Sequence, residues 1–336
     1  MRLSKISLAL ALSGTMFALA FPARAQEPVK VVASFSILAD MVKEIGGDHV
    51  ALTTLVGPDG DAHVYEPTPS DARAVGEAKV LVVNGFQFEG WLPRLVDAAG
   101  FKGRQVVATA GLEPIAIDAE EEEGHDHGAA ETRDGTAHEA SGQDHAHEAA
   151  EAGHEGHDHG ANDPHAWQDL SNGIVYARNI VKGLSEADPA NAADYKAKGD
   201  AFIADLEAMD ERVRTELAAI PAERRKLVTS HDAFGYFARA YGIAFIAPEG
   251  VSTESEASAA DVARIIDQIR AEGISAVFVE NVSDPRLIDR IAAETHARIG
   301  GTLYSDALSG PDGPAATYLD MFRNNIEQIV KALKTS

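Results

Sequence analysis

Hydrophobic positions along this chain alternate between two spacings. Short runs rich in β-branched residues predict buried strands, and apolar residues three or four apart predict amphipathic helices. In the first half, strands are expected at 29–33, 50–56, 79–83 and 105–107, with helices at 37–45, 70–78 and 91–98. In the second half, strands are expected at 227–230, 243–246, 276–280 and 298–303, with helices at 233–241, 259–272, 285–295 and 316–333. Such alternation is typical of parallel sheets covered by helices on both faces.

A purely helical stretch separates the two halves. One helix is expected at 172–185, and a second begins at Asp188, a suitable N-cap, with Pro189 in its first turn, and ends at Ile220. Roughly thirty residues at about 1.5 Å each span about 45 Å, more than one lobe requires. The sequence therefore predicts an α/β protein of two lobes, each a parallel sheet flanked by helices, joined by one long connecting helix.

The domain boundaries follow from this pattern. We expect an N-terminal lobe at 26–187, the linking helix at 188–220 and a C-terminal lobe at 221–336. Residues 1–25 have the basic start, the apolar middle and the Ala-Arg-Ala end of a cleaved signal peptide. Their apolar run is shorter than the ~20 residues that cross a bilayer. We therefore expect a soluble monomer in the periplasm.

Composition narrows the range of partners. The chain has no cysteine, so neither a disulfide nor a lipid anchor on an N-terminal cysteine is expected. Its formal net charge of −24 repels nucleic acid and attracts cations. Hydrophobic residues make up 45% of the chain, enough for a core in each lobe.

Residues 118–162 form an acidic, histidine-rich segment without large apolar side chains, and we predict a disordered loop there. Histidines paired with nearby carboxylates favour weak accessory metal binding, although a solvated insertion is the plain alternative. Transient coordination by such a loop should be weaker than coordination by a preformed site, because ordering the chain opposes it. The histidines of this loop are His125, His127, His138, His145, His147, His154, His157 and His159.

Five histidines lie outside that loop. We assign His49 and His296 to the surface, because neither is expected to have ligand-like neighbours. His63, His165 and His231 follow predicted strands or precede helices, where α/β sheets place their ligand sites. Each of these three, taken singly, is equally consistent with a solvated loop histidine.

Four carboxylates accompany these histidines. Asp61 and Asp163 each stand two residues before a histidine, where a carboxylate caps a turn or orients the imidazole. Asp306 follows the strand expected at 298–303, and Glu280 ends the strand expected at 276–280. Spacing does not choose between Asp306 and Glu280 as a metal ligand.

Three stretches in order carry a family resemblance. They are Asp-Ala-His-Val-Tyr-Glu-Pro-Thr-Pro at 61–69, Asp-Pro-His-Ala-Trp at 163–167, and Thr-Ser-His-Asp-Ala-Phe-Gly-Tyr-Phe at 229–237. Over essentially the whole mature chain, the sequence resembles the zinc- and manganese-binding periplasmic proteins of ABC transporters, of the ZnuA and TroA kind. The resemblance implies metal ligands at His63, His165, His231 and Asp306, two from each lobe. It also leaves Asp61, Asp163 and Glu280 as supporting groups.

Three imidazoles and one carboxylate suit tetrahedral Zn²⁺. The resemblance implies that manganese relatives usually have glutamate at the position of His231, so we expect zinc as the transported ligand. Manganese binding is the alternative within the family, and copper or nickel would also accept imidazoles.

The resemblance further implies a permease and its ATPase as partners, with a periplasmic zinc chaperone as a further candidate. A secreted zinc hydrolase is the rival reading, but catalytic zinc normally keeps one position open for water. A zinc buffer without transport is a third. Because a long helix resists wide bending, we expect small tilts of the lobes on metal binding.

Overall fold

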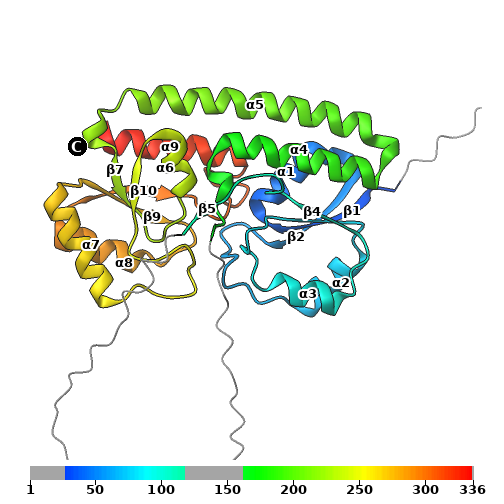
Figure 1. Ribbon diagram of the computed structural model, residues 1–336, viewed down its shortest axis with the longest axis horizontal. Helices are drawn as coiled ribbons and strands as arrows, with labels where there is room; N and C mark the ends of the chain where they lie inside the picture. The colour runs from blue at the N-terminus through cyan, green and yellow to red at the C-terminus, as the bar shows by residue number, and fades with distance from the viewer. Residues whose placement is uncertain (1–26, 118–161, 335–336) are drawn as a thin grey trace, which may run out of the picture.

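The computed structural model describes residues 27–117 and 162–334. Two parallel four-stranded sheets, each flanked by helices, make up two lobes (Figure 1). This arrangement, with a long helix spanning both lobes, confirms the predicted fold class. None of the helices within the described ranges is long and apolar enough to cross a membrane.

The sheet of the N-terminal lobe has the strand order β2-β1-β3-β4. The chain passes from β1 to β2 at one edge, crosses back to β3 on the other side of β1, and continues to β4 at the opposite edge. Every pairing in it is parallel. Its strands are β1 (Val29–Phe35), β2 (Val50–Val56), β3 (Val80–Val83) and β4 (Arg104–Val107). Its crossover helices are α1 (Ser36–Gly46), α2 (Pro69–Glu77) and α3 (Leu92–Ala99). Ligands of such sheets lie beyond the carboxyl ends of the strands, where this order reverses.

The sheet of the C-terminal lobe repeats the design with the order β10-β9-β7-β8. Its pairings are parallel too. Its strands are β7 (Lys226–Val228), β8 (Ala244–Ile246), β9 (Ala276–Glu280) and β10 (Arg298–Leu303). Its helices are α6 (Gly235–Tyr241), α7 (Ala259–Glu272), α8 (Pro285–Thr295) and α9 (Tyr318–Lys334).

Three helices lie along one side of the molecule, and the longest of them spans both lobes. In Figure 1, α5 (Ala192–Ala218) runs along the whole upper edge, with α4 (Leu170–Ala187) and α9 packed beneath it. The 27 residues of α5 span about 40 Å at about 1.5 Å each. The linking helix of the sequence prediction is therefore real, but it begins later, after a separate 3₁₀ turn at Pro189–Asn191.

Asp188 occupies the N-cap position of this 3₁₀ turn, and Asn191 occupies that of α5. The carboxylate of Asp188 makes no capping hydrogen bond to the following turn. It accepts hydrogen bonds from the side chains of Asn191 (2.7 Å) and Tyr195 (2.8 Å) instead. Two other helices have side-chain caps of the usual kind: Thr68 and Asp71 form a capping box at α2, and Asp169 caps α4.

One apolar core extends across both lobes rather than stopping at their boundary. It contains strand residues of the N-terminal sheet, the inner faces of α4, α5 and α9, and Phe278 and Phe322 from the C-terminal lobe. A second, smaller core lies between the C-terminal sheet and helices α7 and α8. The lobes are thus joined by buried apolar contacts as well as by the chain.

The remaining sequence predictions differ from the structure mainly at element ends. The last helix starts at Tyr318 instead of residue 316, and α6 starts at Gly235 instead of residue 233. Asn162, assigned to the predicted loop, belongs to β6 (Asn162–Asp163), which pairs antiparallel with β5 (Ile115–Ala116). The signal peptide at 1–25, and residues 118–161 with their eight histidines, lie outside the described residues.

Candidate metal centre

Four side chains meet between the carboxyl ends of the two sheets. His63 follows β2 and His165 follows β6 in the N-terminal lobe, while His231 follows β7 and Asp306 follows β10 in the C-terminal lobe. One potential ligand atom from each lies within 4.8 Å of the others. All four residues are buried, His63 at 6% exposure and the other three at 0%. The topology places these residues together although 243 positions separate the first from the last along the chain.

The carboxylate of Asp306 lies at the centre of the group. Its Oδ2 is 3.1 Å from Nε2 of His231 and 3.3 Å from Nε2 of His63, and its Oδ1 is 3.6 Å from Nε2 of His165. All three rings therefore turn the same nitrogen toward one carboxylate. Such a set offers three nitrogen donors and one oxygen donor to a single point.

Carboxylates hold two of the rings from behind. Nδ1 of His165 is 2.8 Å from Oδ1 of Asp163, which also accepts a hydrogen bond from the His165 backbone N–H at 2.9 Å. Nδ1 of His231 is 2.7 Å from Oε2 of Glu280. In each case the carboxylate favours the tautomer that leaves Nε2 free as a donor atom.

Glu280 is thus placed behind His231, away from the point where the Nε2 atoms converge. Its Oε1 accepts backbone hydrogen bonds from Ser230 (2.7 Å) and His231 (3.0 Å). This position gives it a supporting geometry, whereas Asp306 faces the three rings. The spacing of the sequence could not make that distinction.

Asp61 contacts the backbone of His63, whereas Asp163 also contacts the ring of its histidine. Its Oδ1 accepts a hydrogen bond from the backbone N–H of His63 at 2.9 Å, which caps the turn. Its Oδ2 accepts a hydrogen bond from the hydroxyl of Thr253 in the C-terminal lobe at 2.6 Å. The ring of His63 packs edge-on against Phe88, with centroids 4.9 Å apart.

Sequence reasoning missed the groups that hold the Asp306 loop. The carbonyl oxygen of Ser305 accepts hydrogen bonds from Trp167 Nε1 (2.9 Å) and Gln168 Nε2 (2.7 Å), both in the N-terminal lobe. The backbone N–H of Leu308 donates to the hydroxyl of Ser36 at 2.9 Å. A ligand candidate of one lobe is therefore positioned by the other. Trp167 ends the Asp-Pro-His-Ala-Trp stretch at 163–167, but no local pattern indicates its partner Ser305.

Charge and burial oppose each other throughout the group. Burial lowers the pKa of His63, and the neighbouring imidazoles lower it further, while Asp306 opposes them. Burial disfavours the charged form of His165 as well, but Asp306 and a second aspartate outweigh it and raise its pKa to about 9. Against burial, Glu280 and Asp306 raise the pKa of His231 well above its ordinary value.

Asp306 shows the converse. Burial alone would raise its pKa, but His231 and His165 hold it well below the ordinary value, so the carboxylate is ionised. An ionised carboxylate among three imidazoles has the charge that a divalent cation requires. A cation entering the group would displace the protons on the rings and take their place.

Several polar atoms facing the group support that reading. Within the described part of the chain, Nε2 of His63, Nε2 of His165 and Oδ1 of Asp306 are buried and have no hydrogen-bond partner. Buried polar atoms are rarely left unsatisfied without a reason. These three atoms face one another, so a cation bound among them would satisfy all three.

The two remaining histidines of the described ranges lie away from this group. His49 lies 2.9 Å from Asp194 at a partly exposed position, and His296 follows α8 in a left-handed conformation at φ 59°. In the described ranges, the group around Asp306 is the only one that brings three or more potential ligand side chains together.

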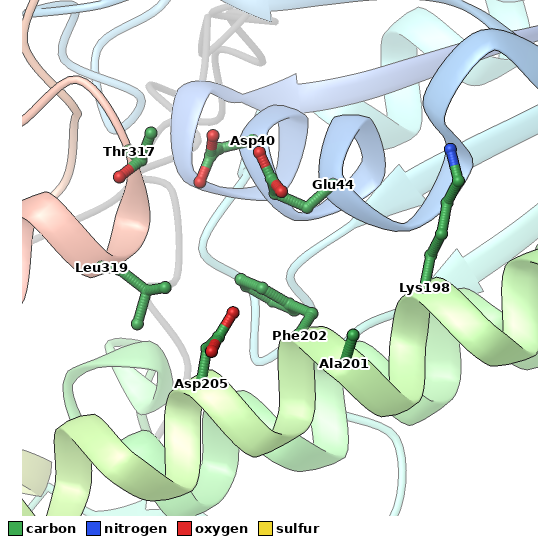
Figure 2. Close-up of a pocket in the computed structure, with 8 residues that line it drawn as sticks. All are labelled: Asp40, Glu44, Lys198, Ala201, Phe202, Asp205, Thr317 and Leu319. Carbon is green, nitrogen blue, oxygen red and sulfur yellow. The ribbon is translucent and has the colours of Figure 1, made fainter.

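A cavity of about 360 Å³ lies away from this group, between α1, α5 and the start of α9. Figure 2 shows the carboxylates of Asp40 and Glu44 on α1, with Asp205 and Lys198 projecting from α5. The backbone N–H of Tyr318, the first residue of α9, donates to Oδ2 of Asp40 at 2.8 Å. This cavity adjoins the helices that join the lobes.

Comparison with known proteins points to one family. Residues 31–332 match the family described as "Zinc-uptake complex component A periplasmic", ZnuA. The iron-binding protein YfeA of Yersinia pestis is 31% identical over 310 residues, which cover 92% of this chain and 88% of the relative. The manganese-binding lipoprotein MntA of Halalkalibacterium halodurans is 30% identical over 308 residues, which cover 91% and 89% of the two chains.

The fold has a close counterpart among solved structures. The periplasmic zinc binding protein TroA from Treponema pallidum superposes with a TM-score of 0.76 at 28% identity, covering 92% of this chain and 99% of that one. Further relatives are named substrate-binding lipoproteins of metal ABC transporters. The names of these relatives include zinc, manganese and iron, so they share a class of cargo rather than one metal.

Proposed function

This chain belongs to the ZnuA family of periplasmic zinc-uptake components, and on that premise we propose that it captures Zn²⁺ and delivers it to the permease of an ABC importer. The observation that carries the proposal is the convergence of three imidazole Nε2 atoms on the buried carboxylate of Asp306. Relatives named as substrate-binding proteins of metal ABC transporters support the transport role, and imply an ATPase subunit as a further partner.

The donor set favours zinc over manganese. Three imidazoles and one carboxylate form a compact tetrahedral set, whereas Mn²⁺ prefers oxygen ligands and a higher coordination number. His63, His165, His231 and Asp306 are the proposed ligands, with Asp163 and Glu280 orienting two of the rings. Manganese is the alternative cargo, since MntA carries it in its name.

The same donor set favours capture over catalysis. Four protein ligands would complete the coordination sphere, whereas a catalytic zinc site keeps a position for water. Two ligands come from each lobe, so a bound cation would tie the lobes together. Because one apolar core extends across both lobes, we expect binding to produce small tilts and loop ordering, without a wide closure.

The proposed location of the protein is outside the cytoplasm. The family description places its members in the periplasm. The lipoprotein names of several relatives conflict with the expectation of an unanchored protein, so the proposal is limited to a location outside the cytoplasm. A monomeric state and a zinc chaperone as donor stay predictions of the sequence.

Metal titration of the purified protein tests the proposal. Metal-free protein is titrated with Zn²⁺, Mn²⁺ and Fe²⁺ in competition with a chromophoric chelator, alongside His231→Ala. We expect one tight Zn²⁺ per chain, weaker Mn²⁺, and at least about a 100-fold loss of Zn²⁺ affinity in His231→Ala, since a direct ligand is removed. His49→Ala is the matched control, because His49 pairs with Asp194 outside the group. Unchanged Zn²⁺ affinity in His231→Ala would refute the site.

A further inference from the structure

A small cavity beside the candidate metal centre is lined by residues of both lobes. Of the four proposed ligands, His63 alone borders it, consistent with its being the one that retains some exposure. The cavity has a volume of about 10 Å³, which is about the space that one water molecule occupies. A cation and its remaining water ligands need more room, so passage requires the rim to part. The residues at its rim include Phe86, Gln87, Phe88, Val251 and Ser252.

The rim is built from both lobes. Phe86 and Gln87 follow β3 in the N-terminal lobe, and Val251 and Ser252 follow β8 in the C-terminal lobe. The width of the cavity therefore depends on the separation of the lobes at this point. A small tilt, of the kind that the shared core allows, would change it directly.

The N-terminal side of the rim is held firmly. The buried carboxylate of Glu89 accepts backbone hydrogen bonds from Asn84 (2.6 Å) and Gly85 (3.4 Å). Phe86 and Gln87, which follow Gly85, have positive φ values of 51° and 61°, which non-glycine residues seldom adopt. Surroundings that fix such a conformation leave it little freedom to move. A tilt that widens the cavity would therefore displace the C-terminal side.

One hydrogen bond ties the segment that follows Val251 and Ser252 to the N-terminal lobe. The hydroxyl of Thr253, next to Ser252, donates to Oδ2 of Asp61 at 2.6 Å. The other oxygen of Asp61 accepts the backbone N–H of His63 at 2.9 Å. A single carboxylate thus connects the movable rim to the loop that carries a proposed ligand.

We propose that the cation enters and leaves through this cavity, and that the Thr253–Asp61 hydrogen bond is the latch that sets its exchange rate. The proposal rests on the metal-capture function above. Neither atom of the latch belongs to a proposed ligand, so breaking it changes how often the rim parts and leaves the donor set intact. Association and dissociation should therefore accelerate by the same factor, with little change in affinity.

Substitution of Thr253 tests the latch. Thr253→Val removes the hydroxyl and keeps the shape, and Thr253→Ser keeps the hydroxyl. Stopped-flow association of Zn²⁺ and its removal by excess chelator are measured for each. We expect both rates of Thr253→Val to rise about threefold to tenfold, the effect of one hydrogen bond, with Kd within about twofold of wild type. Thr253→Ser should exchange like wild type.

Three results would overturn the latch. They are unchanged rates in Thr253→Val, a weaker Kd with an unchanged association rate, and acceleration in Thr253→Ser equal to that in Thr253→Val. The second would assign Thr253 to the site instead of the rim. A wild-type protein that binds no Zn²⁺ would instead refute the proposed function, so the two failures are distinguishable.

A thiol label tests the route. Because the chain contains no cysteine, Ser252→Cys can be modified by a bulky maleimide at that position alone. Labelling the Zn²⁺-loaded protein should slow chelator-induced release at least about tenfold, since the label lies at the rim of the cavity. Lys102→Cys, at an exposed position after α3, carries the same label as a control. Release from labelled Ser252→Cys that is as fast as from the labelled control, or faster, would exclude this route.

Discussion

Glu280→Gln is the substitution that most directly tests how the protein prepares His231 for a metal. Glu280 is 1% exposed, and its Oε2 lies 2.7 Å from Nδ1 of His231. The negative carboxylate beside that nitrogen favours a proton on Nδ1, so Nε2 presents its lone pair to the cation. A glutamine amide would oppose an Nδ1–H, favouring the tautomer that places the proton on Nε2.

The magnitude follows from the contacts. Glutamine is nearly the same size, and its carbonyl can still accept the backbone N–H groups of Ser230 and His231. The fold should persist, while the ring loses its orienting partner. Loss of such a partner typically lowers metal affinity about 10- to 100-fold. That factor corresponds to about 1.4–2.7 kcal/mol of binding free energy.

Competition titration with a chromophoric chelator measures the affinity, and thermal unfolding of the metal-free protein monitors the fold. Glu89→Gln is the matched control, since Glu89 is also buried and accepts two backbone N–H groups, but borders Asn84 and Gly85 instead of an imidazole. We expect its affinity to stay within about threefold of wild type. Equal affinities of Glu280→Gln and wild type, or equal losses in both variants, would refute the tautomer argument.

Three further predictions concern other parts of the molecule. Asp306→Asn should lower Zn²⁺ affinity at least about 100-fold in the same titration, because it removes the only charged donor; a loss below about tenfold would contradict its central place. Burial raises the pKa of Asp40 from 3.8 to about 6, so the folded state binds more protons between those values and its ionised form costs stability above about pH 6. Asp40→Asn should therefore stabilise the protein by up to about 3 kcal/mol at pH 7 and by little at pH 4, measured by urea unfolding; a pH-independent difference would disagree. Deleting residues 119–161 should preserve the tight one-to-one Zn²⁺ site and remove weaker additional binding, as calorimetry would show; a lost tight site would count against the assigned ligands.

Much of the fold was predictable because burial requires a recognisable pattern. Strands covered on both faces, such as β3 with four buried residues, need continuous apolar runs and were placed to within a residue or two. Element ends were less predictable. Asp188 is of a residue type that is common at N-caps, yet in the folded chain its carboxylate accepts hydrogen bonds from Tyr195 and Asn191 instead.

The three histidines illustrate what local sequence can reveal about a site. His63, His165 and His231 each follow a predicted strand or precede a helix, and a parallel sheet brings such positions to one edge. The choice between Asp306 and Glu280 could not be made in this way, since both stand near strand ends. The resemblance to a family favoured Asp306 before any geometry was considered.

The amino-acid sequence by itself determined the two lobes, the connecting helix and the three histidine positions, because these depend on periodicity and on strand ends. Only the tertiary structure shows where the carboxylates lie relative to the imidazole rings. β9 lies beside β7, so Glu280 meets the back of His231. The segment after β10 is held by Trp167 and Gln168 of the other lobe, so Asp306 faces all three rings. Contacts between residues 49 to 138 positions apart decide those placements, and no local pattern records them.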